Sequence, residues 1–166
     1  MTRVCLLGEE DLTLSYELLS RETARRALAA YDLREPYHNS VAVETVSLGA
    51  AVSLLNDLDW YLARFVRAAM VLEPSVSDEE WLSRPLATAI RDGAVDPDET
   101  GRLLKVYGVV SSDGDPDSDT TAERADGPRL VEPMFVARTG GGLPTYDLRA
   151  VDGTLRVRVT ETEFEA

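Results

Sequence analysis

VAVETVSLGAAVSLLNDLDWYLARFVRAAMVLEP, residues 41–74, is the longest apolar pattern in the 166-residue chain. Six apolar residues within it recur at steps of three and four, which places their side chains on one face of an α-helix. These residues are Ala51, Leu54, Leu58, Leu62, Phe65 and Ala69. Apolar runs ahead of the helix, at 41–48, and behind it, at 69–72, predict two short strands. Together they predict a right-handed βαβ crossover with both strands parallel and buried.

Toward the C-terminus the sequence predicts antiparallel strands. Residues 102–110 and 129–138 form two of them, and Pro133 places the second at a sheet edge or a bulge. Asp152-Gly153 is a typical two-residue hairpin turn, here between residues 145–151 and 154–164.

The predicted fold class is therefore α/β, of the mixed α+β kind: a βαβ-containing N-terminal part followed by an antiparallel C-terminal sheet or hairpin. We predict an α/β part at 1–95, built around 41–74, and a mostly antiparallel β part at 96–166. A flexible acidic loop is expected at 111–128, because that segment has no apolar pattern. A single domain containing both parts is the alternative.

Two N-terminal segments have further local signals. Leu12, Leu14, Tyr16 and Leu18 alternate with polar residues, which favours a second strand over a helix at 12–18, although the helix stays open. Ser20 is expected to begin a helix over 21–31.

Residues 77–93 are predicted to form a helix. Ser77 with Glu80 matches a capping box at its start, and Gly93 is expected to end it. Pro85 inside this helix is expected to bend or split it.

The charge balance indicates a halophilic cytoplasmic protein. Thirty acidic residues face seventeen basic ones, for a net charge of −13, and Lys105 is the only lysine. Molar salt screens the repulsion of such a surface by shortening the Debye length to roughly 3 Å. The acidity disfavours nucleic acid as a partner without excluding it, and no apolar run is long enough for a membrane span. The lone Cys5 lies in an apolar strand and is expected to be a core residue.

Two stretches resemble a small uncharacterised haloarchaeal protein family of unknown function. They are YELLSRETARRALAAYDLREPY, residues 16–37, and ETVSLGAAVSLLNDL, residues 44–58. The resemblance implies a haloarchaeal origin and a single unit of this length; it implies no activity.

Carboxylates at strand ends are the candidate metal ligands. If the first strand, at 3–7, were parallel to the strand that ends at Leu72, the residues after each would meet at one sheet edge. These residues are Glu9, Glu10, Asp11 and Glu73. Within about 5 Å of one another, they would hold Mg²⁺ for phosphoryl transfer. Alternating Asp113, Asp115, Asp117 and Asp119 loosely match a calcium loop but lack its glycine and its final glutamate.

The candidate binding residues are three arginines. In the predicted hairpin, Arg149, Arg156 and Arg158 fall on one face, and their mutual repulsion suggests an anionic partner. If they are structural instead, each should pair with a carboxylate. His38 is expected on the surface, Gly140–Gly142 in a turn, and Trp60 and Trp81 in the core or a subunit interface.

These observations favour a non-enzymatic interaction or regulatory module without a cofactor. Its partner is expected to be a protein, another anionic molecule, or a second copy in a homodimer. A Mg²⁺-dependent phosphoryl-transfer enzyme is the alternative.

The acid excess predicts strong salt dependence. The melting temperature should rise steeply between low and molar KCl, because only salt screens the self-repulsion of the surface. Thermal melts across that range measure it, and a flat melting temperature would contradict the halophilic interpretation.

Overall fold

The computed structural model of the chain describes residues 1–111, 128–139, 144–148 and 150–165. Its strands are β1 (Thr2–Gly8), β2 (Ser40–Thr45), β3 (Val66–Leu72), β4 (Trp81–Ser83), β5 (Leu103–Val110), β6 (Arg129–Ala137) and β7 (Gly153–Arg158). Its helices are α1 (Leu14–Leu19), α2 (Glu22–Leu28), α3 (Leu48–Asp57), α4 (Asp59–Phe65), α5 (Arg84–Arg91) and α7 (Glu161–Glu165), with one 3-10 turn, η1 (Pro97–Glu99).

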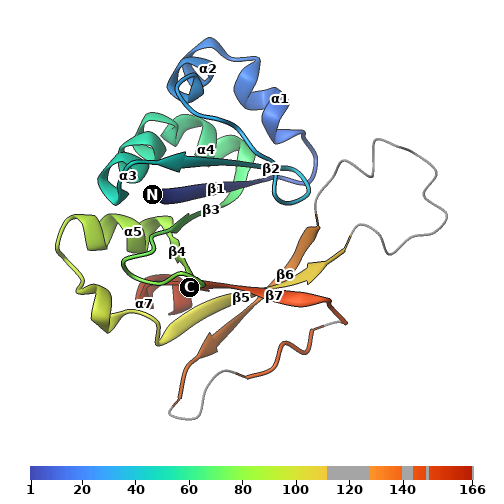
Figure 1. The fold of residues 1–166 in the computed structure, drawn as a ribbon. Helices are drawn as coiled ribbons and strands as arrows, with labels where there is room; N and C mark the ends of the chain where they lie inside the picture. The colour runs from blue at the N-terminus through green and yellow to red at the C-terminus, as the bar shows by residue number, and fades with distance from the viewer. Residues whose placement is uncertain (112–127, 140–143, 149, 166) are drawn as a thin grey trace.

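All seven strands belong to one sheet in the order β2-β1-β3-β4-β7-β5-β6 (Figure 1). Among the strand pairs of the described residues, only β4–β7 is parallel. The predicted mixed α+β class is confirmed. Both predicted parts, 1–95 and 96–166, contribute strands to this sheet.

The predicted βαβ unit is present, but a third strand separates its two strands. β2 and β3 both pair antiparallel with β1, so they run parallel to each other on either side of it. The single predicted helix is two helices, because Leu58 leaves the helical conformation between α3 and α4. β3 begins at Val66, so Ala69 lies in the strand and not on the helix. The spacing of apolar residues alone revealed neither the break at Leu58 nor the start of β3 at Val66.

Residues 14–19 form helix α1, so the favoured strand at 12–18 and its hairpin were wrong. Leu14 and Leu18 are one helical turn apart and fully buried, whereas Tyr16 between them is exposed. The alternating pattern was ambiguous because Leu14 and Leu18 fit either period. Ser20 ends α1 instead of beginning the next helix, and α2 starts at Glu22.

The predicted helix over 77–93 begins later than its capping motif. Ser77 Oγ accepts hydrogen bonds from the backbone N–H groups of Glu79 and Glu80, but the chain then enters β4. Ser83 caps α5, which places Pro85 at the second helical position, where it causes no kink. Gly93 follows the helix with a positive φ of 75°, as predicted.

At the C-terminus, β6 forms the sheet edge, as Pro133 predicted, and its pairing with β5 has a register shift next to that proline. The hairpin predicted at Asp152-Gly153 does not form. β7 pairs with β5 and β4, and residues 144–148, 150 and 151 are not strand. The chain ends in α7, where Thr160 and Glu163 form a reciprocal capping box that sequence reading had placed in a strand.

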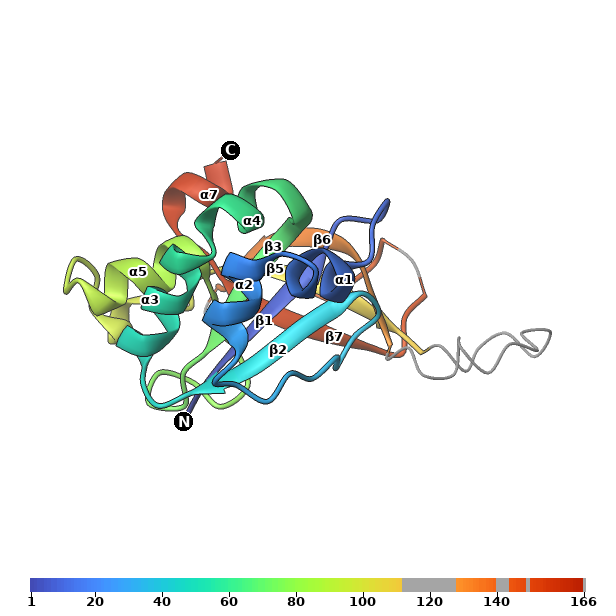
Figure 2. The same ribbon diagram turned by 90° about the horizontal axis from the view of Figure 1, so that it is seen from above.

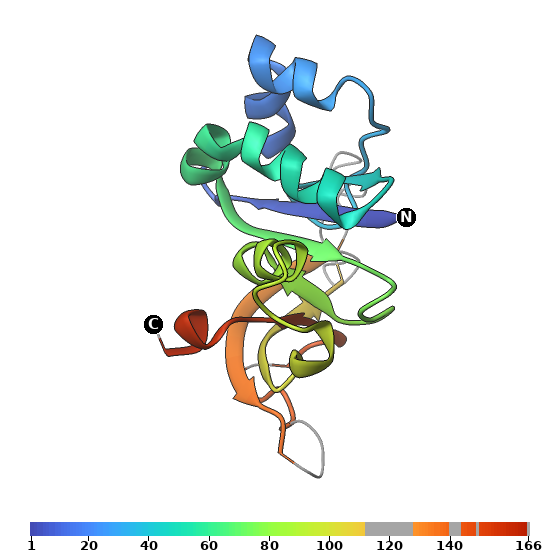
Figure 3. The same cartoon turned by 90° about the vertical axis from the view of Figure 1, so that its left-hand side faces the viewer.

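Two apolar clusters lie on opposite faces of the sheet. α1 to α5 cover one face, where residues such as Leu14, Leu55 and Leu82 are buried (Figures 1 and 2). The sheet twists strongly along its length, so that β6 crosses β1 steeply (Figure 3). On the second face, Cys5 and Met70 pack in one cluster with residues of β5, β6 and β7. Burial raises the pKa of the Cys5 thiol to about 12, as expected of a core residue.

Asn39 fixes the connection between β1 and α1. Its Oδ1 accepts from the Leu14 N–H at 2.8 Å, and its Nδ2 donates to the Glu9 and Leu12 carbonyls at 2.8 and 2.9 Å. Its φ of 54° is the only positive value among the described non-glycine residues. Sequence reading passed over Asn39 because its partners are 25 to 30 residues away.

Replacing Asn39 with glycine should lower the free energy of unfolding by about 3 kcal/mol, because three side-chain hydrogen bonds worth about 1 kcal/mol each are lost. Glycine tolerates the positive φ, so this variant isolates the hydrogen bonds. Asn39→Ala should be less stable still, because it adds backbone strain. Urea unfolding measures the series, and a glycine variant as stable as the parent would disprove the role.

Candidate functional site

The four candidate metal ligands do not meet. Because β1 and β3 are antiparallel, Glu9, Glu10 and Asp11 follow one end of β1 while Glu73 lies at the other. Thr2, the first residue of β1, donates its hydroxyl hydrogen to Glu73 at 2.6 Å. Seven strand residues span roughly 20 Å, far more than one Mg²⁺ can bridge. The prediction that these four carboxylates share one Mg²⁺ ion was therefore wrong. It assumed that β1 and β3 run parallel, and they run antiparallel.

Within the described residues, no group of three or more His, Cys, Asp and Glu side chains is placed to hold a metal ion. The calcium-loop candidates Asp113, Asp115, Asp117 and Asp119 lie outside the described residues, as do Gly140–Gly142. His38 lies in the turn before β2, where its backbone N–H donates to the Pro128 carbonyl.

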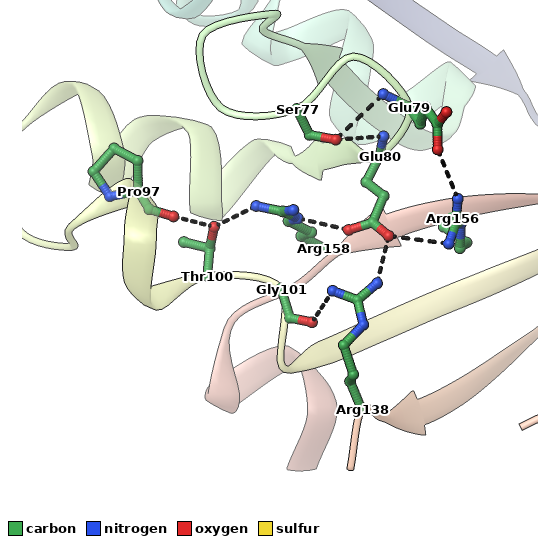
Figure 4. Close-up of polar contacts among 9 residues, drawn as sticks. All are labelled: Ser77, Glu79, Glu80, Pro97, Thr100, Gly101, Arg138, Arg156 and Arg158. Atoms are coloured by element: carbon green, nitrogen blue, oxygen red, sulfur yellow. Dashed lines mark hydrogen bonds and ion pairs between the residues drawn. The ribbon is translucent and has the colours of Figure 1, made fainter. Parts of the chain in front are cut away.

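The densest ionic cluster centres on Glu80, in the connection before β4 (Figure 4). Its carboxylate accepts from Arg158 Nε at 2.8 Å and from Arg138 Nη2, and it forms an ion pair with Arg156 Nη1 at 3.2 Å. Arg156 also reaches the exposed Glu79 at 3.3 Å. These contacts join the loop before β4 to β7 and to the end of β6.

The guanidinium groups of Arg158 and Arg138 each donate one further hydrogen bond to a neutral oxygen. Arg158 Nη1 donates to Thr100 Oγ1 at 2.9 Å, and Arg138 Nη1 donates to the Gly101 carbonyl at 3.0 Å (Figure 4). The Thr100 hydroxyl in turn donates to the carbonyl of Pro97, the first residue of η1. The turn after α5 is thereby tied to the same cluster.

Glu80 is charged although only 6% of its surface is exposed. Burial by itself would raise the pKa of its carboxyl group. The hydrogen bonds and charges of Arg158 and Arg138 outweigh burial and hold the pKa below its usual value. Three guanidiniums face two carboxylates, so the cluster keeps one excess positive charge.

Two of the three candidate binding arginines therefore have carboxylate partners. The alternation along β7 correctly put Arg156 and Arg158 on one side, but the carboxylate that pairs with both precedes them by more than 70 residues. Such pairing is the arrangement expected of structural arginines. Arg149 lies outside the described residues, and capture of an anion by the three arginines stays a prediction.

A second cluster, which sequence reading missed, combines aromatic rings with arginines on α4 and at the start of α2. We call it the aromatic–arginine patch; it consists of Arg21, Trp60, Tyr61, Arg64 and Phe65. The Arg64 guanidinium carbon lies 3.8 Å from the Trp60 ring centroid, and that of Arg21 lies 4.9 Å from the Phe65 centroid. The Trp60 ring meets those of Tyr61 and Phe65 edge to face, with centroids 5.0 and 6.1 Å apart.

The patch is accessible, because Trp60 keeps 48% of its surface exposed. Trp81, in contrast, is buried in β4. The i, i+4 spacing of Trp60 and Arg64 was the available signal, but only the packing of α1 and α4 brings Arg21 to the rings. Arg21 pairs with Glu17, whereas Arg64 has no carboxylate partner among the residues the structure describes.

Among the described helices, none has the length and apolar character needed to span a membrane. Comparison with known proteins matched residues 2–109, more than half of the chain, to a family of unknown function (DUF5804). No curated protein and no solved structure matched.

Replacing Glu80 with glutamine should lower the free energy of unfolding by about 3–5 kcal/mol at neutral pH, because three arginines lose their shared buried charge. Glu79→Gln is the matched control and should cost less than about 1 kcal/mol, because Glu79 is exposed. Chemical unfolding of both variants in molar KCl measures the difference.

Comparing the parent protein with Glu80→Gln across pH tests the lowered pKa of the Glu80 carboxyl group. A lowered folded-state pKa stabilises the fold above the usual value of 4.5, and this contribution is lost as the pH falls through the lowered value. The stability gap between the parent and Glu80→Gln should therefore shrink below pH 4.5. A gap that stays constant with pH would refute the role given to the Glu80 charge.

Proposed function

The chain belongs to a family of unknown function (DUF5804), and we propose that it is a non-enzymatic interaction module that binds an acidic segment of another protein. The aromatic–arginine patch is the proposed binding surface. The observation that carries the proposal is the half-exposed Trp60 with an arginine stacked on its ring.

Three properties of the patch support protein binding. Tryptophan, tyrosine and arginine dominate the residues that contribute most to binding energy at protein interfaces. Stacking of Arg64 on Trp60, at 3.8 Å, holds two large side chains in place, so less conformational entropy is lost on binding. A half-exposed tryptophan also offers a large apolar surface that a partner can cover.

Charge indicates what kind of partner fits. In a chain of net charge −13, Arg64 offers guanidinium donors that no described carboxylate uses. Carboxylates next to an apolar side chain would match both the arginines and the rings. A two-fold homodimer built on the patch would instead bring equivalent patches together and place their arginines near one another.

We further propose that the protein works in the cytoplasm of a halophile, which the acid-rich, lysine-poor composition supports. In molar salt, long-range attraction between charges is screened, so a patch used there has to rely on contact. Aromatic stacking and hydrogen-bonded arginines suit that requirement. The phosphoryl-transfer alternative lacks its carboxylate site, because the predicted ligands lie at opposite ends of β1.

Site-specific photo-crosslinking tests this function. A photoreactive residue at exposed Asp57, three residues before Trp60 in the chain, should capture one defined protein in native cells, through a peptide that carries Asp or Glu beside an apolar residue. A photoreactive residue at Val46, which is 80% exposed, is the control and should not capture it.

With the captured peptide in hand, Trp60→Ala and Arg64→Gln should each weaken binding about tenfold or more. Both variants should stay folded at the temperature of the binding assay, because Arg64 is exposed and Trp60 is half-exposed outside the buried core. An affinity equal to that of the parent in both variants, or capture of a second copy of this chain alone, would rule out the proposal.

A further inference from the structure

A cavity of about 280 Å³ lies between α4, β3, the start of α5, β5 and α7. It is separate from the Glu80 cluster and is lined by a different set of α4 residues from those of the aromatic–arginine patch. Five of its lining residues are charged and one is a serine. They are Asp59, Arg67, Ser83, Arg84, Lys105 and Glu163.

The carboxylates of the cavity already have partners. Asp59 forms an ion pair with Arg84 at 2.8 Å. Glu163 Oε1 accepts hydrogen bonds from the Ser83 hydroxyl and from the Thr160 N–H. Neither carboxylate forms an ion pair with the two remaining cations, Arg67 and Lys105.

Arg67 and Lys105 have no carboxylate partner among the residues that the structure describes. Arg67 Nη2 donates to the Leu130 carbonyl at 3.1 Å, a neutral acceptor. The Lys105 ammonium lies 5.1 Å from the Tyr107 ring centroid, which does not neutralise its charge. Both cations thus bring to the same cavity positive charge that no described carboxylate pairs with, and a bound anion would neutralise it.

The fold brings Arg67 and Lys105 to the same cavity from two strands that are not neighbours in the sheet. Arg67 is at the start of β3 and Lys105 is in the middle of β5, with β4 and β7 between them in the sheet. β4 has only three residues, and the last of them, Ser83, caps α5. Lys105 is also the only lysine among seventeen basic residues. A lysine ammonium is a compact charge with three rotatable donors, which suits a small anion.

We propose that this cavity binds a small oxyanion, a phosphate or carboxylate group, held by Lys105 and Arg67. The volume is below the range typical of drug-sized ligands, so the bound group is small. Free guanidinium and ammonium donors on both cations supply charge-assisted hydrogen bonds to its oxygens. The proposal is independent of protein binding by the aromatic–arginine patch.

NMR titration of the ¹⁵N-labelled full chain tests the site. Inorganic phosphate and succinate are titrated separately, with KCl adjusted to keep the ionic strength constant. Saturable shifts are expected for amides around the cavity, such as those of Ala68, Ala69 and Lys105. The anion that binds more tightly identifies the ligand class.

Variants of Lys105 assign the binding to this cavity. Lys105→Gln should weaken binding about tenfold or more, because one charge-assisted contact is lost, whereas Lys105→Arg should retain most of it. Arg25→Gln is the control, because Arg25 is an exposed cation outside the cavity that likewise has no ion pair with any residue that the structure describes. Shifts that never saturate, or an affinity that Lys105→Gln leaves unchanged, would overturn the proposal.

Discussion

The buried charge of Glu80 is the interaction on which the joining of the two halves of the chain depends. β4 and β7 form the only parallel pair in the sheet, and they match over two residue pairs, Trp81 with Val157 and Leu82 with Arg158. So short a ladder fixes register weakly. Glu80 immediately precedes β4, and Arg156 and Arg158 flank Val157, so the ion pairs form beside the ladder. Shifting β7 by one residue would turn both arginines to the other face and leave a buried carboxylate unpaired, which is costly.

The family match covers only one side of the junction between β4 and β7. It covers β1 to most of β5, and so includes Glu80, but it ends before β6 and β7. β7 nevertheless lies between β4 and β5 in the sheet. The matched segment therefore cannot build this continuous sheet alone. The arginines that neutralise Glu80 all come from beyond it, as do apolar residues such as Leu155 and Val157 that complete the second core cluster.

α4 connects the two proposed binding regions. Trp60, Arg64 and Phe65 belong to the exposed patch, whereas Asp59, Leu62 and Ala63 line the cavity beside β3. The helix is held in place because Leu58 and Leu62 are buried in the core. Both regions thus rest on a rigid element, which limits the entropy that binding would cost.

Sequence alone determined the features that depend on neighbours in the chain. The apolar spacing of 51–62, the edge position that Pro133 requires and the stop at Gly93 all follow from local sterics and burial. Residue alternation also placed Arg156 and Arg158 on one side of their strand. Two of the five charged residues in the Glu80 cluster were therefore predictable as neighbours.

Tertiary structure decided two things that local patterns left undecided: which capping motif begins a helix and which strands pair. Ser77 with Glu80 and Thr160 with Glu163 match the same capping motif, yet only the second forms a reciprocal box before a helix. Glu80 is instead drawn to arginines far along the chain, whose combined charge outweighs one capping hydrogen bond. Likewise β1 enters between β2 and β3, and β7 pairs with β5 instead of forming a hairpin, because strand partners are selected by long-range burial that no short stretch of sequence encodes.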